Sequence, residues 1–419
     1  MMPPAASRAI LLFLLVGSSA GAAHAGPFGF TRSRASAAHP LVLLAPRPTP
    51  DATLRIQFGA GSHQDGNLPG LTRLAQHAMI RANAQADFRA FMLDAYAAGA
   101  SLEIETGMHD SALTLTAPGA SFESLAGRLL RMCLAPRIEA RDFEHARGRM
   151  LEDGLFSNPG GLASVLTGYV FLASGHDFDP LGDEASIQQI SLAQVNRHIA
   201  AHLSPANSLV AVAGSFSARR VLALVNQHHG GGRATPQPAP MTFSGNYRVE
   251  GPYEIYMLAY PLELETTEQI AATHILGAML QERVQRKFRH LGIAYSTDVR
   301  PIHHLWIDFI MVFLPVYRES GSSIEQVVQE QIDRLREPAA REDFLRNQAY
   351  LLHRLASDER DSLELALGLA RSRGTPGWYG RELVDEIRKA TFERFVTTTG
   401  GWLNPRSRVQ VSFSPKISN

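Results

Sequence analysis

The sequence predicts an α+β fold of two homologous domains, each a mainly antiparallel sheet covered by helices on one face. Strand-like alternation of apolar and polar residues and helix-like apolar stripes both occur in each half of the chain. Similar segments recur about 200 residues apart, as in Leu203-Ser204-Pro205 and Leu403-Asn404-Pro405. The 419 residues also exceed what one hydrophobic core usually supports. We therefore expect a duplicated unit.

Charge and composition exclude several classes of protein. The 40 basic residues (Lys and Arg) equal the 40 acidic ones, and no dense basic run supplies the patch that nucleic-acid binding requires. A hydrophobic content of 45% argues against a disordered chain. The single cysteine, Cys133, rules out an internal disulfide framework and a thiolate zinc cluster. It lies in an apolar helical stretch, so we expect an inert, buried thiol.

Residues 1–25 have the pattern of a secretory signal peptide. Arg8 precedes a short apolar run, and the small residues of Ala23-His24-Ala25 stand before Gly26. The run is shorter than the ~20 apolar residues that span a membrane. We expect cleavage after Ala25, export to a bacterial periplasm, and no membrane span in the mature chain.

Residues 39–229 are expected to form the N-terminal domain. Along the chain we predict a strand, a helix, two strands, further helices and a final strand. Ser191 is expected to cap one helix, because its side chain can accept a backbone hydrogen bond at the helix start. The predicted segments are Thr53–Phe58, Gly70–Met79, Ser101–Thr106, Ser111–Thr116, Phe122–Leu130, Leu192–Leu203 and Leu209–Gly214.

Residues 230–245 are rich in Gly and Pro and are predicted to be a linker. Residues 246–415 then repeat the pattern as a C-terminal domain. The segment Glu254–Tyr260 matches the first predicted strand, and Glu342-Asp343-Phe344 opens a long helical pattern as Arg141-Asp142-Phe143 does. Several matches at a common offset, with a linker between them, make duplication a better explanation than chance.

The most informative segment is the predicted helix from Gly70 to Met79. Its apolar residues fall on one face, whereas Arg73, Gln76 and His77 share another, because they are three and four residues apart. Taken alone, this pattern is typical of an ordinary amphipathic helix, in which a histidine is more often structural than a metal ligand.

The surroundings of this helix resemble the pitrilysin/insulinase family of metallopeptidases, the inverzincins, whose helix carries the zinc motif H-x-x-E-H. In that family a strand and a small-residue turn precede the helix. Here the strand is Thr53–Phe58 and the turn is Gly59–Ser62. A Gly-rich turn and an edge strand follow it, here Ala98–Ile104. A later helix, here Phe143–Asp153, carries the last zinc ligand. The resemblance covers nearly all of the mature chain and implies the insulinase-like metallopeptidase fold.

The zinc motif itself is degenerate. Arg73 stands in place of the first His and Gln76 in place of the catalytic Glu, whereas His77 matches the second His. Asp153, or Glu152 if the alignment shifts by one residue, falls at the distal Glu. Arg has no lone pair to donate, an amide cannot act as a general base, and catalytic zinc usually takes three protein ligands. We therefore expect no catalytic residue and no metal, with His77, Asp153 and Glu152 as residual ligand candidates. We also hypothesise that Arg73 pairs with Asp153 or Glu152.

The predicted edge strand is the first candidate for peptide binding. It contains Ser101, Leu102, Glu103 and Ile104, along which a peptide can add as an extra strand.

A second candidate lies in the C-terminal half, where related enzymes hold substrate with an Arg and a Tyr seven residues apart. Tyr295 matches that Tyr, but Phe288 stands at the Arg position, which leaves Arg286 or Arg289 as replacements. We take Tyr295 and Arg289 as the candidates. A purely structural Tyr295, in a strand that packs on a helix, is an equally open interpretation.

Together these features predict a pseudoenzyme. We expect the non-catalytic subunit of an exported zinc-dependent peptidase, which shapes the peptide chamber and binds substrate in a heterodimer with an active insulinase-family chain. Zinc is expected in that partner, and no cofactor in this chain. Two alternatives stay open: an active metallopeptidase with atypical ligands, including His77 and Asp153, and a stand-alone peptide-binding or assembly protein.

Overall fold

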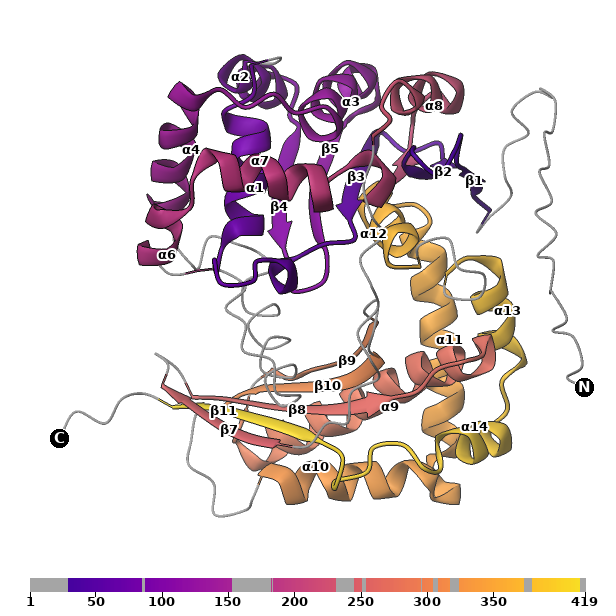
Figure 1. The fold of residues 1–419 in the computed structure, drawn as a ribbon. Coiled ribbons are helices and arrows are strands. Elements are labelled where there is room, and N and C mark those ends of the chain that lie inside the picture. The colour runs from indigo at the N-terminus through magenta and orange to yellow at the C-terminus, as the bar shows by residue number, and fades with distance from the viewer. Residues whose placement is uncertain are drawn as a thin grey trace, which may run out of the picture.

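The protein is described by a computed structural model that covers residues 29–84, 87–152, 182, 184–230, 245–250, 254–294, 296–303, 308–316, 324–372 and 379–414. It contains two α+β halves, coloured from indigo to magenta and from orange to yellow in Figure 1. In each half, helices pack on one face of a sheet to form a hydrophobic core. The α+β prediction is confirmed.

The first half forms a six-stranded sheet with the order β1-β2-β6-β3-β5-β4. β2 and β6 run parallel, and the other neighbouring strands are antiparallel. β4 therefore lies at one edge of the sheet, as the sequence predicted for this segment. The strands are β1 (Thr31–Ser33), β2 (Leu41–Pro46), β3 (Asp51–Phe58), β4 (Ser101–Thr106), β5 (Ser111–Pro118) and β6 (Ser208–Gly214).

The second half forms a five-stranded sheet with the order β7-β11-β8-β10-β9. β7 and β11 run parallel, and the other neighbouring strands are antiparallel. The strands are β7 (Gly245–Glu250), β8 (Ile255–Leu262), β9 (Asp298–His303), β10 (Asp308–Pro315) and β11 (Val409–Ser414). With β1 set aside, the two sheets have the same strand order and the same single parallel pair, which agrees with the duplication inferred from the sequence.

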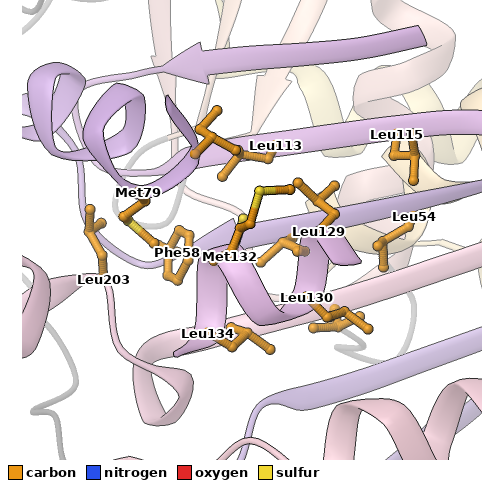
Figure 2. Close-up of a cluster of buried hydrophobic side chains, with 14 of the residues drawn as sticks. Leu54, Phe58, Met79, Leu113, Leu115, Leu129, Leu130, Met132, Leu134 and Leu203 are labelled. Carbon is orange, nitrogen blue, oxygen red and sulfur yellow. The ribbon is translucent and has the colours of Figure 1, made fainter. Parts of the chain in front are cut away.

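Helices pack on the core face of the first sheet, where Leu54, Ile56 and Phe58 of β3 are fully buried. Figure 2 shows part of this core, including Met79 of α1 and Leu129 and Met132 of α3. Cys133, also on α3, is buried as expected. The helices of this half are α1 (Leu71–Arg81), α2 (Phe88–Ala97), α3 (Gly119–Leu134), α4 (Ala140–Glu152), α6 (Glu184–Gln189), α7 (Leu192–His202) and α8 (Ala218–Asn226), with short 3-10 turns at Ser62–Gln64 and Pro205–Asn207.

The second core forms around α9, a helix of 25 residues. Thr266 and Gln269 make a capping box at its start, as Ser191 and Gln194 do for α7, which confirms the predicted Ser191 cap. Gly292 ends α9 with a φ of 67°, a value that glycine adopts without strain. The helices are α9 (Thr267–Leu291), α10 (Ile324–Asp333), α11 (Arg341–Asp358), α12 (Ser362–Ser372), α13 (Arg381–Lys389) and α14 (Phe392–Thr399), with 3-10 turns at Arg334–Arg336 and Pro338–Ala340.

One helix of the second half, α12, packs on the first sheet. It lies on the face opposite the first core, against β2, β3 and β6 (Figure 1). The buried apolar side chains of this contact are Leu43, Ala45, Leu209, Ala211 and Ala213 of the sheet and Leu365, Ala366, Leu369 and Ala370 of α12. Strands β2, β3 and β6 of the first sheet are therefore covered on both faces, and the helix on their second face belongs to the other half.

Two polar contacts accompany this packing. Thr53 Oγ1 lies 2.9 Å from the hydroxyl oxygens of both Thr116 and Ser362. Arg47, which follows β2, forms an ion pair with Glu359 at 2.6 Å, and both side chains are less than one-tenth exposed. A buried pair of this kind is costly to break, because removal of one partner leaves the other charged and desolvated.

No helix among the described residues is long and apolar enough to cross a membrane. The predicted signal peptide and residues 231–244 of the predicted linker lie outside the described residues. The domain boundaries at 39–229 and 246–415 stay a prediction.

Replacement of Leu369 by Ala is expected to destabilise the first half, although Leu369 belongs to the second. A buried Leu-to-Ala change typically costs about 2–5 kcal/mol. Cys133 reports the effect, because its buried thiol reacts with a disulfide reagent only when the first core opens. We expect faster thiol reaction in L369A. The control is L345A, since Leu345 is 53% exposed. Equal reaction rates in the two variants would show that α12 does not support the first sheet.

Candidate functional site

The start of α1 is held by a buried carboxylate that the sequence analysis did not identify. Asp65 accepts hydrogen bonds from the backbone N–H of Gly70 at 2.9 Å and of Thr72 at 2.8 Å, which satisfies donors that a helix start leaves unpaired. Burial raises the pKa of Asp65 to about 7 against the opposing effect of these hydrogen bonds. The Thr72 hydroxyl also lies 2.9 Å from Nε2 of His198 and thereby connects α1 to α7.

The polar face of α1 is buried, contrary to the amphipathic pattern. Arg73 is 6% exposed, Gln76 is fully buried and His77 is 7% exposed. The structure therefore brings the three degenerate motif positions together inside the protein. A buried polar side chain needs a partner, because its desolvation is otherwise uncompensated.

Gln76 meets this need by bonding to the edge of the sheet. Its amide nitrogen donates to the backbone oxygen of Glu105 at 3.2 Å and of Ala112 at 3.4 Å. Its amide oxygen accepts from the Thr106 hydroxyl at 2.6 Å. Gln76 thus links α1 to both β4 and β5. A carboxylate at this position has no N–H to donate to the two carbonyl oxygens, so the amide fits a structural task that Glu does not.

His77 is held neutral. Burial lowers its pKa to about 3, and the positive charges of Arg81 and Arg73 act in the same direction. Its Nδ1 has no hydrogen-bond partner within the described residues. A neutral imidazole can bind a metal, but one such ligand beside an arginine does not make a zinc site.

The side chains described at the motif positions do not fit zinc. Arg73 offers no lone pair, and the Gln76 amide is committed to β4 and β5. Within the described part of the chain, no three His, Cys, Asp or Glu side chains come together as a metal site requires. Asp153 and the side chain of Glu152 lie outside the described residues, although α4 packs against α1. The proposed pairing of Arg73 with either acid stays a prediction.

The candidate peptide-binding strand β4 has two different faces. Ser101 and Glu103 are exposed, whereas Leu102 and Ile104 pack against the first core. β4 pairs with β5 on one side, and no described strand pairs with its other side. That free side can accept a further strand through backbone hydrogen bonds. Peptide binding at these four residues stays a prediction.

The second candidate site is described only in part, because Tyr295 lies outside the described residues. Phe288, at the position of the family Arg, is fully buried in the second core. Arg286 forms an ion pair with Glu282, which also binds Arg346. Arg289 is exposed in the last turn of α9.

Comparison with known proteins agrees with the family resemblance. A family model described as the Peptidase M16 inactive domain matches residues 189–351. No curated protein sequence matches the chain.

Solved structures share the fold across most of the chain. The peptidase M16 inactive domain from Pseudomonas fluorescens is 20% identical, with a TM-score of 0.72 over 93% of this chain and 99% of that one. The first half of the periplasmic protease PqqL from Escherichia coli is 14% identical, with a TM-score of 0.70 over 92% of each chain. The ferredoxin protease FusC, solved in complex with Arabidopsis ferredoxin, is 16% identical, with a TM-score of 0.61. There the match covers 90% of this chain but 44% of FusC.

Replacement of Gln76 by Glu is expected to destabilise the protein. The change removes the donor to two backbone oxygens and buries a carboxyl group, which costs about 1–3 kcal/mol for unsatisfied groups alone. Chemical denaturation measures the loss. The control is Q189E, because Gln189 is exposed on α6. A Q76E variant as stable as the control would contradict the structural role of the amide.

Stability is expected to fall with pH below about 6.5. His77, His198 and His274 have pKa values lowered to about 3, chiefly by burial. The unfolded chain therefore binds protons that the folded chain excludes, so stability present above pH 6.5 is lost as the pH falls toward 3. Each histidine contributes up to about 1.4 kcal/mol per pH unit. Asp65 opposes this in part, because its raised pKa favours the folded state at low pH.

Unfolding free energies measured between pH 5 and pH 7.5 test this dependence. H198N should flatten the slope, whereas H145N should leave it unchanged, because His145 is exposed. If the unfolding free energy changed with pH equally in both variants, His198 would be excluded as a cause of the pH dependence.

Proposed function

We propose that this chain is a catalytically degenerate member of the pitrilysin/insulinase (M16) peptidase family and acts as the non-catalytic subunit of a zinc-dependent peptidase. In this role it holds peptide substrate beside an active partner chain. It forms part of the wall of the peptide chamber and makes charged and backbone contacts with the peptide. The partner supplies the zinc ion and the general base.

The bonding of Gln76 carries the proposal. The side chain at the catalytic position holds the edge strand β4 through Glu105 and Thr106. Strand addition needs a fixed edge with free backbone groups and no catalytic residue. Gln in place of Glu therefore removes the general base. The Gln76 amide also stabilises the strand along which a peptide would lie.

The pairing with a partner is supported by relative size. The chain matches 44% of FusC, which is a protease in complex with a protein ligand. We propose that this chain is one of two similar units, and that a second unit with an intact motif completes the enzyme. We further propose that the protein is exported, on the basis of residues 1–25.

A photo-crosslinking experiment tests peptide binding at β4. Glu103→Cys places an attachment point on the exposed face of β4, and Thr31→Cys places a matched one on β1 at the opposite edge. The native Cys133 is buried, so a thiol-linked crosslinker labels only the introduced residue. We expect E103C to capture an extended peptide and T31C not to. An N-methylated copy of the peptide should fail to compete, because it lacks donors for strand pairing.

Metal analysis and turnover test the non-catalytic part of the proposal. We expect the pure chain to contain no stoichiometric zinc and to cleave no peptide, with or without a chelator. Chelator-sensitive turnover by the pure chain would favour the active-peptidase alternative. Purification from native cells should yield an intact-motif zinc peptidase together with this chain, and its absence would favour the stand-alone alternative.

A further inference from the structure

The two sheets have edge strands at equivalent places in their strand orders, β4 in the first sheet and β9 in the second. Among the described strands, β4 pairs only with β5 and β9 only with β10, so each has one free side. On its free side a strand presents the backbone N–H and C=O groups of every second residue. Whether those groups are already bonded decides whether the edge can accept another strand.

The free side of β4 presents the backbone groups of Leu102 and Ile104. The Gly107 N–H donates to the Asp110 oxygen at 2.8 Å across the turn between β4 and β5. Hydrogen-bonded and non-bonded pairs alternate along an antiparallel ladder, so the odd-numbered residues of β4 bond to β5. The backbone groups of Leu102 and Ile104 therefore point away from β5, and no described residue hydrogen-bonds to them there.

The outer edge of β9 is closed. The Val316 N–H donates to the Glu254 oxygen at 2.9 Å, so the even-numbered residues of β10 bond to β8 and the odd-numbered ones to β9. Val299 and Pro301 lie opposite even-numbered residues of β10, and their backbone groups therefore face outward. Val299 donates its N–H to Oε1 of Gln281 at 2.5 Å, and Pro301 has no N–H to offer. Of the two equivalent edges, β4 is the one with outward donors free at the positions compared.

A strand added to β4 would place its side chains alternately on two different surfaces. On one surface lie Leu102 and Ile104, which pack against the first core. On the other lie Glu103 and Glu105, and Glu105 forms an ion pair with Arg55 at 2.5 Å. Glu103 is exposed and makes no ion pair or side-chain hydrogen bond with any described residue. The charge that remains available to a ligand on this surface is therefore negative.

We propose that β4 selects a peptide whose side chains alternate between apolar and basic, with apolar ones beside Leu102 and Ile104 and a basic one beside Glu103. The inference rests on the proposed function and specifies its substrate class. Side chains directly opposite each other on neighbouring strands lie close enough to interact. An apolar side chain there extends the surface of the first core, and Lys or Arg beside Glu103 forms a cross-strand ion pair. The alternation holds for a peptide in either direction, because successive side chains of any strand point to opposite faces.

Binding of matched peptides to the full chain tests this assignment. The probes are extended peptides with Val at every second position and Arg, Gln or Glu at one position between two Val residues. A fourth peptide keeps Arg and has Ser in place of each Val. Fluorescence anisotropy gives the Kd for wild type, E103Q, E103R and a control, E382Q, since Glu382 is exposed on α13. Thermal unfolding of each variant verifies that it is folded.

We expect wild type and E382Q to bind the Arg peptide most tightly, then the Gln peptide, then the Glu peptide. Each step should be about two- to fivefold, as a cross-strand charge pair gives. E103Q should bind the three peptides equally, and E103R should reverse their order. The Ser peptide should bind more weakly than its Val counterpart in every variant, because the contact with the apolar surface is lost.

Several outcomes would overturn the inference and leave the proposed function intact. One is an order of affinities that persists in E103R, and another is equal binding of the Val and Ser peptides. A third is wild-type protein that shows no preference while E103Q binds all peptides more tightly, because Glu103 would then only protect the edge from strand addition. Failure of every peptide to bind overturns the inference and the proposed function together.

Discussion

The packing of α12 on the first sheet is the contact on which the rest of the structure depends. A sheet with two apolar faces is stable only when both are covered, and here the second cover comes from the other half of the chain. The buried ion pair between Arg47 and Glu359 adds a directional contact at the same junction. The duplicated halves are therefore not independent units, because they share this apolar layer.

At the degenerate motif, the side chain of Gln76 has a structural role in place of a catalytic one. In the metallopeptidases that this chain resembles, a Glu at the position of Gln76 acts on water, which requires a carboxylate free to take up a proton. Here the amide donates to two backbone oxygens and accepts from Thr106, so every part of it is engaged. Burial, together with the charges of Arg81 and Arg73, keeps the neighbouring His77 neutral. Through Gln76, α1 stabilises the edge strand β4.

Local patterns were sufficient to predict much of this fold. The alternation in residues 101–106 and 111–116, the Ser191 cap and the matching segments of the two halves are short-range signals, and the structure follows them closely. The same patterns did not reveal that the polar face of α1 is buried, because burial there depends on β4, β5 and α7 packing around it.

The shared sheet has a consequence for the order in which the protein folds. β2 and β6 are complete once residue 214 has been synthesised, but the helix that covers their second face ends at residue 372. Until then, a growing chain holds Leu43, Leu209 and their neighbours on an uncovered apolar surface. Long-range contacts of this kind slow folding, and an uncovered surface favours aggregation or chaperone binding in the interval. The first half, although made first, is therefore expected to be the last to become fully native.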